Sequence, residues 1–539
     1  MESKRRKQTT QPQNKKTNEL TRNSKTVPSS HEVGKRKDEI AVLPRLEVGF
    51  YCLFIAVMMY IVMNELHQQS KAYFFNLKRY NFEDGWSILG ILKKDSSDKE
   101  WKHFISLFNP VNMLGIAGYV VLSHIMQQNL PQHKQWSLFV YSIVCYLVAL
   151  SLPTLLLICA HVIAMFILAK TQSVYVIWAG VIFQISTLNY TFLMSPILKY
   201  FKSDDYYIMV IIVAMASVRS MSFGLEYCKE SAQANQKYSF FNYLVYLFYL
   251  PTFITGPLMS YEQFYQQYIS SPVIHRYSNI LKEFFYYIFW AVFLELILHF
   301  LYFSAFHNER SVLMSISPMA VGASALCHLY FFQIKYVVIY GLSRTLALVD
   351  GVEAPKPPNC IMAMYQYSDM WRYFDRGLHH ILMKYIYFPF GGSKHGIIRQ
   401  LLGAFVCFLY VCYWHGFNRN YCYWAFFNWM GIVFESVVII VTSTESFNNF
   451  MNSLFSRAMQ RRLSAFCWTP IYVCLSLSNI VFLAGTRTTY IYFERLILSD
   501  FPRNCCFMWL LYYMTIQLIK ECHLQFGKKY LCEKNYRIA

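Results

Sequence analysis

The sequence predicts an all-α polytopic membrane protein, and two features of its composition support this fold class. Of its 539 residues, 55% are hydrophobic and only 15% are charged, whereas soluble proteins carry about a quarter charged residues. The apolar residues gather in long runs, and most segments between these runs are short and carry the charge. No internal repeat is visible in the sequence, which argues against a transporter built from inverted repeats.

Apolar segments that approach the roughly 20 residues needed to cross a bilayer recur along the chain. The candidates are 47–64, 103–126, 136–152, 153–170, 173–196, 206–226, 239–257, 283–306, 319–346, 397–416, 421–443, 465–485 and 505–520. Several are interrupted or rich in aromatic residues. We therefore expect about 10–12 true crossings, the remaining segments being interfacial or re-entrant helices.

The charge distribution predicts three parts of the chain. Residues 1–45 hold 12 Lys/Arg and 5 Asp/Glu, and a polar segment of this kind is expected to be a disordered basic tail. Its position before the first span predicts a cytosolic N-terminus close to anionic lipid rather than nucleic-acid binding. The first apolar run continues as a full span, unlike a cleavable signal peptide. Residues 46–525 form the predicted membrane domain, with its core at about 345–486, and 526–539 form a short C-terminal tail.

The stretch Trp371–Gly416 combines several unusual features. At spacing i, i+4, Trp371 and Asp375 are expected on one helix face, with His379 one turn further along. The Pro/Gly-rich segment Phe388–Gly396 then predicts a fold-back, and an apolar run ends at His415. Because ionisable groups at membrane depth are costly, those that are present often serve a function.

The residues alone leave two interpretations open for each ionisable group. His415 is either an interfacial histidine at a helix end or a general base, since an unperturbed imidazole has a pKa of about 6.5. Asp375 is either paired at the surface with Arg372 or Arg376, or an acid or charge partner inside a chamber.

Other polar groups lie inside apolar runs. Arg219, Lys335, Arg344 and Glu435 are expected to be paired within the bundle. Asn479 either hydrogen-bonds a neighbouring helix or donates to an acyl carbonyl group. The 15 cysteines are mostly scattered through apolar runs, and we expect most of them to be buried free thiols.

Several motifs resemble the membrane-bound O-acyltransferase superfamily and, within it, the Hedgehog acyltransferase group, which includes the insect enzyme Rasp (Skinny hedgehog). The motifs are MWRYFD (Met370–Asp375), GLH (Gly377–His379), FPFGGSKHG (Phe388–Gly396) and YWHG (Tyr413–Gly416). DGVEAPKPPNC, GPLMSYEQF, NWMGIVFE and LSNIVFLAG extend the similarity, which covers about residues 47–525. The resemblance implies a bundle of membrane helices with re-entrant segments that encloses a catalytic chamber.

The resemblance also implies roles for individual residues. His415 and Asp375 correspond to the catalytic pair, with His415 as the general base. The positions expected to line an acyl-CoA tunnel are Trp371, Arg372 and Asn479, and Cys360 falls where close animal relatives present a thiolate to haem b.

The implied reaction is transfer of palmitate from palmitoyl-CoA to the N-terminal cysteine amine of a secreted signalling protein. The implied acceptors are Hedgehog and Spitz-type EGF-receptor ligands, and the implied location is the endoplasmic reticulum membrane, with the Golgi as a second compartment. Two alternatives remain: an O-acyltransferase acting on lysophospholipid or a serine hydroxyl, and a non-catalytic membrane scaffold or carrier.

Overall fold

The computed structural model describes residues 41–90, 92–189, 203–230, 236–270 and 275–526. Residues 1–40 of the predicted basic tail and 527–539 of the predicted C-terminal tail lie outside this range. The described residues are almost all helical, which confirms the predicted all-α class. Their one sheet is a short antiparallel hairpin in which Phe82 pairs with Asp95.

The first part of the described chain contains ten α-helices and the hairpin. These elements are α1 (Arg45–Ala72), β1 (Phe82–Asp84), β2 (Lys93–Asp95), α2 (Lys99–Ser106), α3 (Pro110–Asn129), α4 (Lys134–Ala149), α5 (Leu152–Ala169), α6 (Val174–Asn189), α8 (Ser203–Tyr227), α9 (Phe240–Leu247), α10 (Tyr261–Phe264) and α11 (Tyr277–Ile297). Short helical turns join them: η2 (Phe74–Asn76), η3 (Arg79–Asn81), η4 (Ser87–Leu89), η5 (Pro131–His133), η7 (Leu250–Thr252) and η8 (Tyr265–Ser270).

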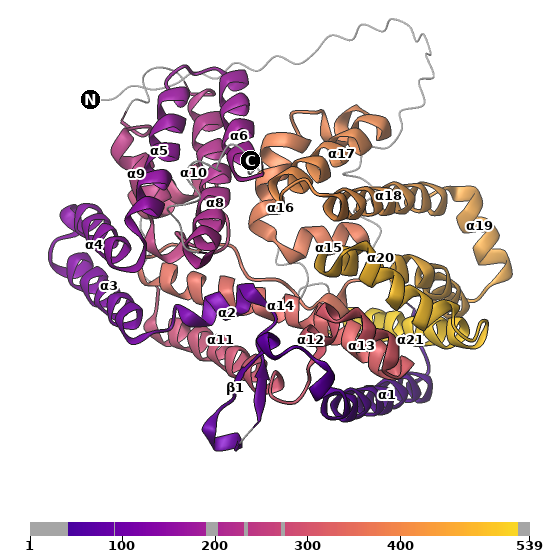
Figure 1. Cartoon of the computed structure of the whole chain (residues 1–539). Helices are drawn as coiled ribbons and strands as arrows, with labels where there is room; N and C mark the ends of the chain where they lie inside the picture. The colour runs from indigo at the N-terminus through magenta and orange to yellow at the C-terminus, as the bar shows by residue number, and fades with distance from the viewer. Residues whose placement is uncertain (1–40, 91, 190–202, 231–235, 271–274, 527–539) are drawn as a thin grey trace, which may run out of the picture. The chain divides into compact units, whose positions relative to one another are not determined.

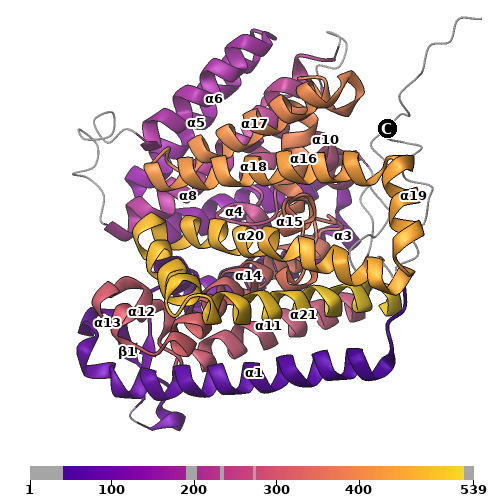
Figure 2. The same cartoon turned by 90° about the vertical axis from the view of Figure 1, so that its right-hand side faces the viewer.

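The second part contains the elements expected to carry the site. They are α12 (Phe303–Asn308), α13 (Arg310–Ser315), α14 (Pro318–Val349), η9 (Ile361–Ala363), α15 (Tyr367–Phe374), α16 (Arg376–Leu382), η10 (Met383–Tyr387), η11 (Gly392–His395), α17 (Ile397–Trp414), α18 (Arg419–Thr442), α19 (Glu445–Leu454), α20 (Arg457–Phe493), η12 (Glu494–Leu498) and α21 (Arg503–Phe526). Helices α17, α18, α20, α21 and α1 pack as successive neighbours (Figure 2).

Seven helices of the described residues are long and apolar enough to cross a membrane, and an eighth crossing results if the bent pair α2 and α3 forms one span. This number is smaller than the predicted 10–12. Segment 239–257 forms only the short helix α9, followed by a 3₁₀ turn that contains Pro251, a residue that disrupts helix interiors. Segment 283–306 is divided, because α11 ends at Ile297 and α12 begins at Phe303.

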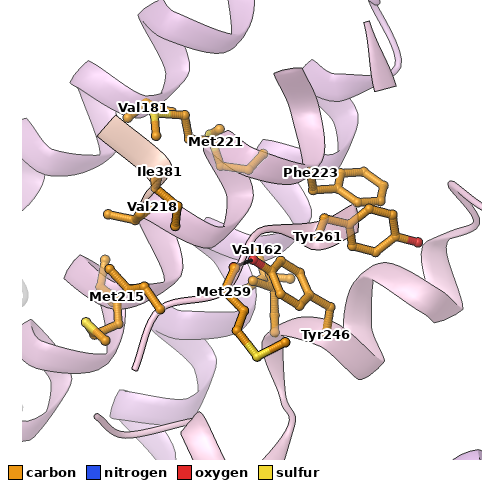
Figure 3. Close-up of a cluster of buried hydrophobic side chains, with 14 of the residues drawn as sticks. Val162, Val181, Met215, Val218, Met221, Phe223, Tyr246, Met259, Tyr261 and Ile381 are labelled. Carbon is orange, nitrogen blue, oxygen red and sulfur yellow. Dashed lines mark hydrogen bonds between the residues drawn. The ribbon is translucent and has the colours of Figure 1, made fainter. Parts of the chain in front are cut away.

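A densely packed core forms where α5, α6 and α8 lie side by side (Figure 1). Apolar side chains from these helices interdigitate with Tyr246, Met259 and Tyr261, and Ile381 of α16 reaches into the same cluster (Figure 3). Gly377 allows this approach, because a Cβ atom there would lie 2.2 Å from the Leu258 carbonyl oxygen. The core therefore fixes one side of α16.

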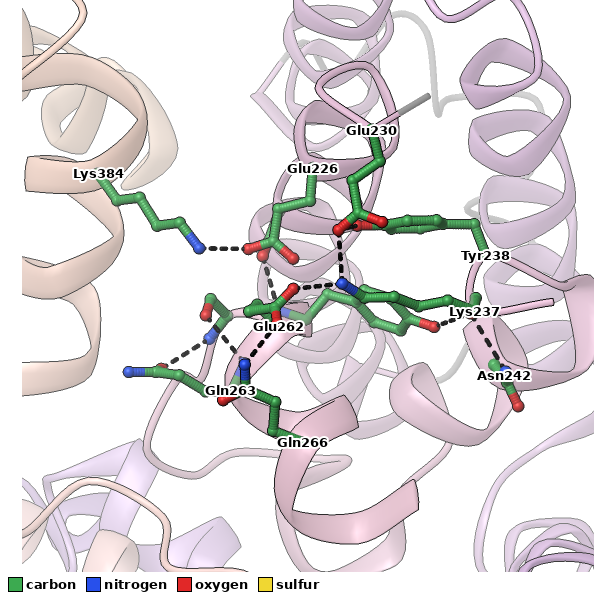
Figure 4. Close-up of polar contacts among 12 residues, drawn as sticks. Glu226, Glu230, Lys237, Tyr238, Asn242, Glu262, Gln263, Gln266 and Lys384 are labelled. Carbon is green, nitrogen blue, oxygen red and sulfur yellow. Dashed lines mark hydrogen bonds and ion pairs between the residues drawn. The ribbon is translucent and has the colours of Figure 1, made fainter. Parts of the chain in front are cut away.

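A polar network ties the segment after α16 to the end of α8 (Figure 4). Lys384 forms an ion pair with Glu226 at 2.6 Å, and the Tyr385 hydroxyl donates to the same carboxylate. Next to it, Lys237 bridges Glu230 and Glu262, each at 2.6 Å. The neighbouring carboxylates thus have lysine partners, and the network holds η10 against α8.

The chain turns between η10 and α17, as the sequence predicted for Phe388–Gly396. Gly391, Gly392 and Gly396 all have positive φ angles, and α17 packs against both η10 and η11. The fold-back brings the helix that ends at His415 next to the segment that begins at Asp375. Helix α20, which carries Asn479, is kinked at Gly485.

Candidate acyl-transfer site

A cavity of about 1110 Å³ lies among α14, α15, α16, α17, α18 and α20 and extends to α1 and α21. Its wall is mainly apolar and aromatic. Drug-sized ligand pockets measure about 300–1,000 Å³, so this cavity is large enough for a long acyl chain together with part of a second substrate. The polar residues of its wall include Arg372, Asp375, His379, His415 and Asn479.

Asp375 lies at the junction between α15 and α16. The helix does not continue through it as the i, i+4 spacing predicted, because Asp375 has non-helical φ and ψ angles and caps α16. Its Oδ1 accepts the Leu378 N–H at 2.9 Å, and its Oδ2 accepts the Tyr340 hydroxyl at 3.0 Å. Burial raises the pKa of this carboxyl group, although the two hydrogen bonds oppose the shift.

His415 caps the C-terminus of α17, one residue beyond the apolar span. The turn is closed by hydrogen bonds from Gly416 N–H to Tyr413 O and from Phe417 N–H to Cys412 O. Gly416 adopts φ +112°, a conformation that glycine tolerates at helix ends. The helix end is also anchored to α8, since the Trp414 indole N–H donates to Ala214 O at 2.9 Å.

Aromatic rings surround the His415 imidazole. Its centroid lies 4.9 Å from that of Phe482 and 5.7 Å from that of Tyr421. No group of the described residues is hydrogen-bonded to its ring nitrogens. Burial lowers the pKa of the imidazole to about 4, so the ring is neutral near pH 7 and its nitrogens are available to a substrate.

The two predicted catalytic residues line the same cavity without touching. Within the described residues, no hydrogen bond or ion pair joins Asp375 to His415. His379 also lines the cavity, and burial, together with Arg372 and His380, lowers its pKa to about 4.

The three residues predicted to line an acyl-CoA tunnel all face this cavity. The Trp371 indole N–H donates to Asn428 Oδ1 at 3.1 Å, which fixes the ring. Arg372 is exposed, and no carboxylate of the described residues pairs with it. Asn479 likewise has no hydrogen-bond partner among the described residues, so its amide can donate to a ligand.

No feature of the structure around Cys360 supports its predicted role as a haem ligand. Cys360 precedes η9 and lies outside the wall of the cavity, although its neighbours Ile361 and Met362 belong to it. The described residues contain no group of three or more His, Cys, Asp or Glu side chains that could hold a metal ion. The structure therefore does not support the haem prediction, and we assign haem no role.

The predicted pairing of charges within the bundle is confirmed for Lys335 and Arg344. Lys335 forms ion pairs with Asp98 at 2.9 Å and Glu100 at 2.8 Å. Arg344 pairs with Glu283 and Glu353. The remaining two have neutral partners: Arg219 donates to the Thr252 carbonyl oxygen, and Glu435 accepts from Ser368.

Sequence reasoning missed two residues that position the site. Tyr340 donates to Asp375, and Asn428 holds Trp371. Tyr336 and Tyr340, four residues apart on α14, both line the cavity. The spacing of Tyr336 and Tyr340, which places two phenols on one face of α14, was the available signal, although tyrosines are also common where helices meet the membrane surface.

The fold and the site define a multi-pass membrane protein with a large, mainly apolar internal cavity. The model of the membrane-bound O-acyltransferase family (MBOAT) matches residues 163–478. The chain belongs to this family, as its motifs predicted, and an acyltransferase activity is the class of function that this membership supports.

Three curated relatives are similar over most of the chain. The mouse protein-cysteine N-palmitoyltransferase HHAT is 29% identical over 428 residues, which cover 77% of this chain and 86% of the relative. The Drosophila melanogaster protein-cysteine N-palmitoyltransferase Rasp is 23% identical over 463 residues, or 84% and 90% of the two chains. The Candida tropicalis membrane-bound O-acyltransferase GUP1 is 24% identical over 479 residues, or 78% and 79%.

Proposed function

We propose that this protein transfers palmitate from palmitoyl-CoA to the N-terminal cysteine amine of a secreted signalling protein of the Hedgehog type. One observation carries the proposal: a neutral imidazole, a carboxylate and an unpartnered amide, those of His415, Asp375 and Asn479, line one large apolar cavity. Two relatives named as protein-cysteine N-palmitoyltransferases favour the acceptor. Spitz-type ligands are further proposed acceptors.

In the proposed reaction the acceptor amine attacks the thioester carbonyl carbon. An α-amino group has a pKa of about 8 and must be neutral to attack. His415 accepts the proton that the amine loses as the N–C bond forms, and this proton then passes to the CoA sulfur as the C–S bond breaks. Neither ring nitrogen of His415 has a hydrogen bond from the described residues, so the basic nitrogen is open to accept this proton.

Three further side chains interact with charged or polar groups of the substrates in this mechanism. The Asn479 amide donates to the carbonyl oxygen, where negative charge develops in the tetrahedral intermediate. Asp375, held by Tyr340 and the backbone of α16, orients the ammonium or amine of the acceptor. Arg372, which has no acidic partner among the described residues, pairs with a phosphate of CoA.

We also propose the cellular arrangement. The protein lies in the endoplasmic reticulum membrane with its N-terminus in the cytosol, with residues 1–45 as a basic tail and 46–525 as the membrane domain. A cytosolic acyl-CoA and a lumenal acceptor then approach one cavity from opposite faces of the membrane.

An acyl-transfer assay with purified full-length protein tests the proposal. Palmitoyl-CoA is offered together with matched peptides that begin with Cys or Ser, and in a parallel reaction with lysophospholipid. We expect amide formation on the Cys peptide to exceed acylation of the other acceptors. Preferred acylation of lysophospholipid or of the serine hydroxyl would replace this proposal with O-acylation. Transfer to none of the acceptors would favour a scaffold or carrier.

A further inference from the structure

Two cysteines flank the turn that carries His415. Cys412 lies in the last turn of α17 and Cys422 in the first turn of α18, and their sulfur atoms are 3.6 Å apart. Both are free thiols, and no other pair of cysteines among the described residues makes a sulfur–sulfur hydrogen bond. A disulfide bond is about 2.05 Å long, so an approach of roughly 1.5 Å would join them.

The backbone around this pair is part of the His415 turn. The Cys412 carbonyl oxygen accepts the Phe417 N–H at 3.0 Å, and the Cys422 N–H donates to Asn418 O at 3.0 Å. Asn418 also caps α18. A displacement of either cysteine therefore also moves the turn between α17 and α18, which sets the position of His415.

The side chain next to Cys422 contacts the imidazole itself. Tyr421 packs against His415 with ring centroids 5.7 Å apart, and it also contacts Phe482 at 5.1 Å. Pulling the first turn of α18 towards α17 shifts Tyr421, and with it the aromatic enclosure that holds the imidazole. Because that ring has no hydrogen bond from the described residues, its position depends on this enclosure.

We propose that Cys412 and Cys422 form a reversible disulfide that lowers acyl transfer by displacing His415. The effect on activity rests on the proposed function, whereas formation of the disulfide does not. Cys422 is half-buried and Cys412 is buried, so Cys422 is the sulfur that reacts first with a small oxidant.

The chemistry is a thiol–disulfide exchange with a low-molecular-weight disulfide. The Cys422 thiolate attacks one sulfur of that compound, which forms a mixed disulfide and releases one small thiol. Cys412 then attacks the Cys422 sulfur, forms the protein disulfide and releases the second small thiol. The protein loses two electrons to the small disulfide, and the two thiol protons end on the released thiols.

A displacement of about 1 Å at a catalytic group can cost on the order of 10²-fold in rate. We therefore expect oxidation to lower kcat by roughly 10- to 100-fold, with recovery after a phosphine reductant. The expected change lies in kcat because the displaced group is the proposed base, while the parts of the cavity wall that come from α14, α15, α16 and α20 stay in place.

The test uses the purified full-length protein and 2,2′-dithiodipyridine as the small disulfide. Non-reducing proteolysis and mass spectrometry should detect a peptide pair joined through Cys412 and Cys422. Acyl transfer to the Cys peptide is measured before oxidation, after it and after reduction. Cys422→Ser should resist inactivation, and Cys412→Ala provides a second variant that cannot form the bond. Cys474→Ser removes an exposed cysteine of α20 and should remain as sensitive as the native protein.

Three outcomes would overturn the proposal: absence of the joined peptide, full activity of the joined protein, or equal inactivation of Cys422→Ser and the native protein. Absence of acyl transfer in the reduced native protein has a different meaning. It contradicts the proposed function, while the joined peptide still decides whether the disulfide forms.

Discussion

The two faces of α16 have different surroundings. One face carries Ile381, which is 0% exposed and embedded in the packed core of Figure 3. The other face, with Leu378 and His379, lines the cavity, as does Asp375 at the helix N-terminus. This short helix thus lies between a packed core and the cavity.

This difference explains how packing on one face of α16 fixes the position of the site while the other face leaves space for a substrate. The packed face is stabilised by dispersion contacts and by burial of apolar surface. Removing side-chain volume there therefore lowers the free energy of unfolding. The cavity face gains little from packing, so substitutions there should change chemistry more than stability. Substitutions on the two faces of α16 should therefore have opposite effects on activity and on stability.

Removing the imidazole tests the cavity side most severely. His415→Ala should lower transfer to the Cys peptide by about 10²- to 10⁴-fold, the usual contribution of a general base. The melting temperature should change little, because the ring borders the cavity. Single-turnover assays and thermal unfolding measure the two effects. His395→Ala, at an exposed histidine of the preceding turn, serves as the control and should retain native activity.

Shortening Ile381, on the packed face, should lower stability more than activity. Ile381→Ala should lower the free energy of unfolding by about 2–5 kcal/mol, the usual cost of a buried Ile-to-Ala change. Activity per folded molecule should fall much less than in His415→Ala. Ile398→Ala, at a residue that is 73% exposed, is the matched control. A loss of activity without a loss of stability in Ile381→Ala would refute the division of roles.

Removing the charge of Asp375 tests the residue at the boundary between the two faces. Asparagine still caps a helix, so Asp375→Asn should remain folded while transfer falls by roughly 10- to 100-fold through loss of the carboxylate. The split between kcat and KM measures this role. The control is Asp369→Asn, which changes a carboxylate of α15 outside the cavity wall. This variant should have little effect on transfer.

The pKa of His415 leads to a smaller, pH-dependent effect on stability. Its pKa is about 4 in the folded protein and about 6.5 in an unfolded chain. The unfolded state therefore binds more protons between these values, and the stability that the neutral imidazole contributes is lost as the pH falls from about 6.5 towards 4. Unfolding midpoints at pH 7.5 and 5.5 should differ less in His415→Gln than in the native protein.

The sequence predicted the helical class well because long apolar runs have few alternatives in a membrane. It was less successful with segments such as 239–257, where apolar residues fill a buried short helix instead of a span, since hydrophobicity alone does not distinguish these two cases. The fold-back at Phe388–Gly396 was predictable because its glycines are local signals.

The site was predictable only in part. The residues alone left the roles of His415 and Asp375 open. The similarity to the family motifs identified them as the predicted catalytic pair. The helix break at Asp375 was missed because an i, i+4 pattern does not reveal a side chain that caps the next helix. Tyr340 was missed because its partner lies 35 residues away in sequence, a contact that no local pattern encodes.

The proposed mechanism requires that the cavity binds the acyl donor. A photoreactive palmitoyl-CoA analogue with a diazirine in the acyl chain tests it directly, with peptides identified by mass spectrometry after irradiation. The account predicts labelling of peptides from α17 and α20, displaced by excess palmitoyl-CoA. Competable labelling confined to the packed helices α5 and α8, with α17 and α20 unlabelled, would contradict it.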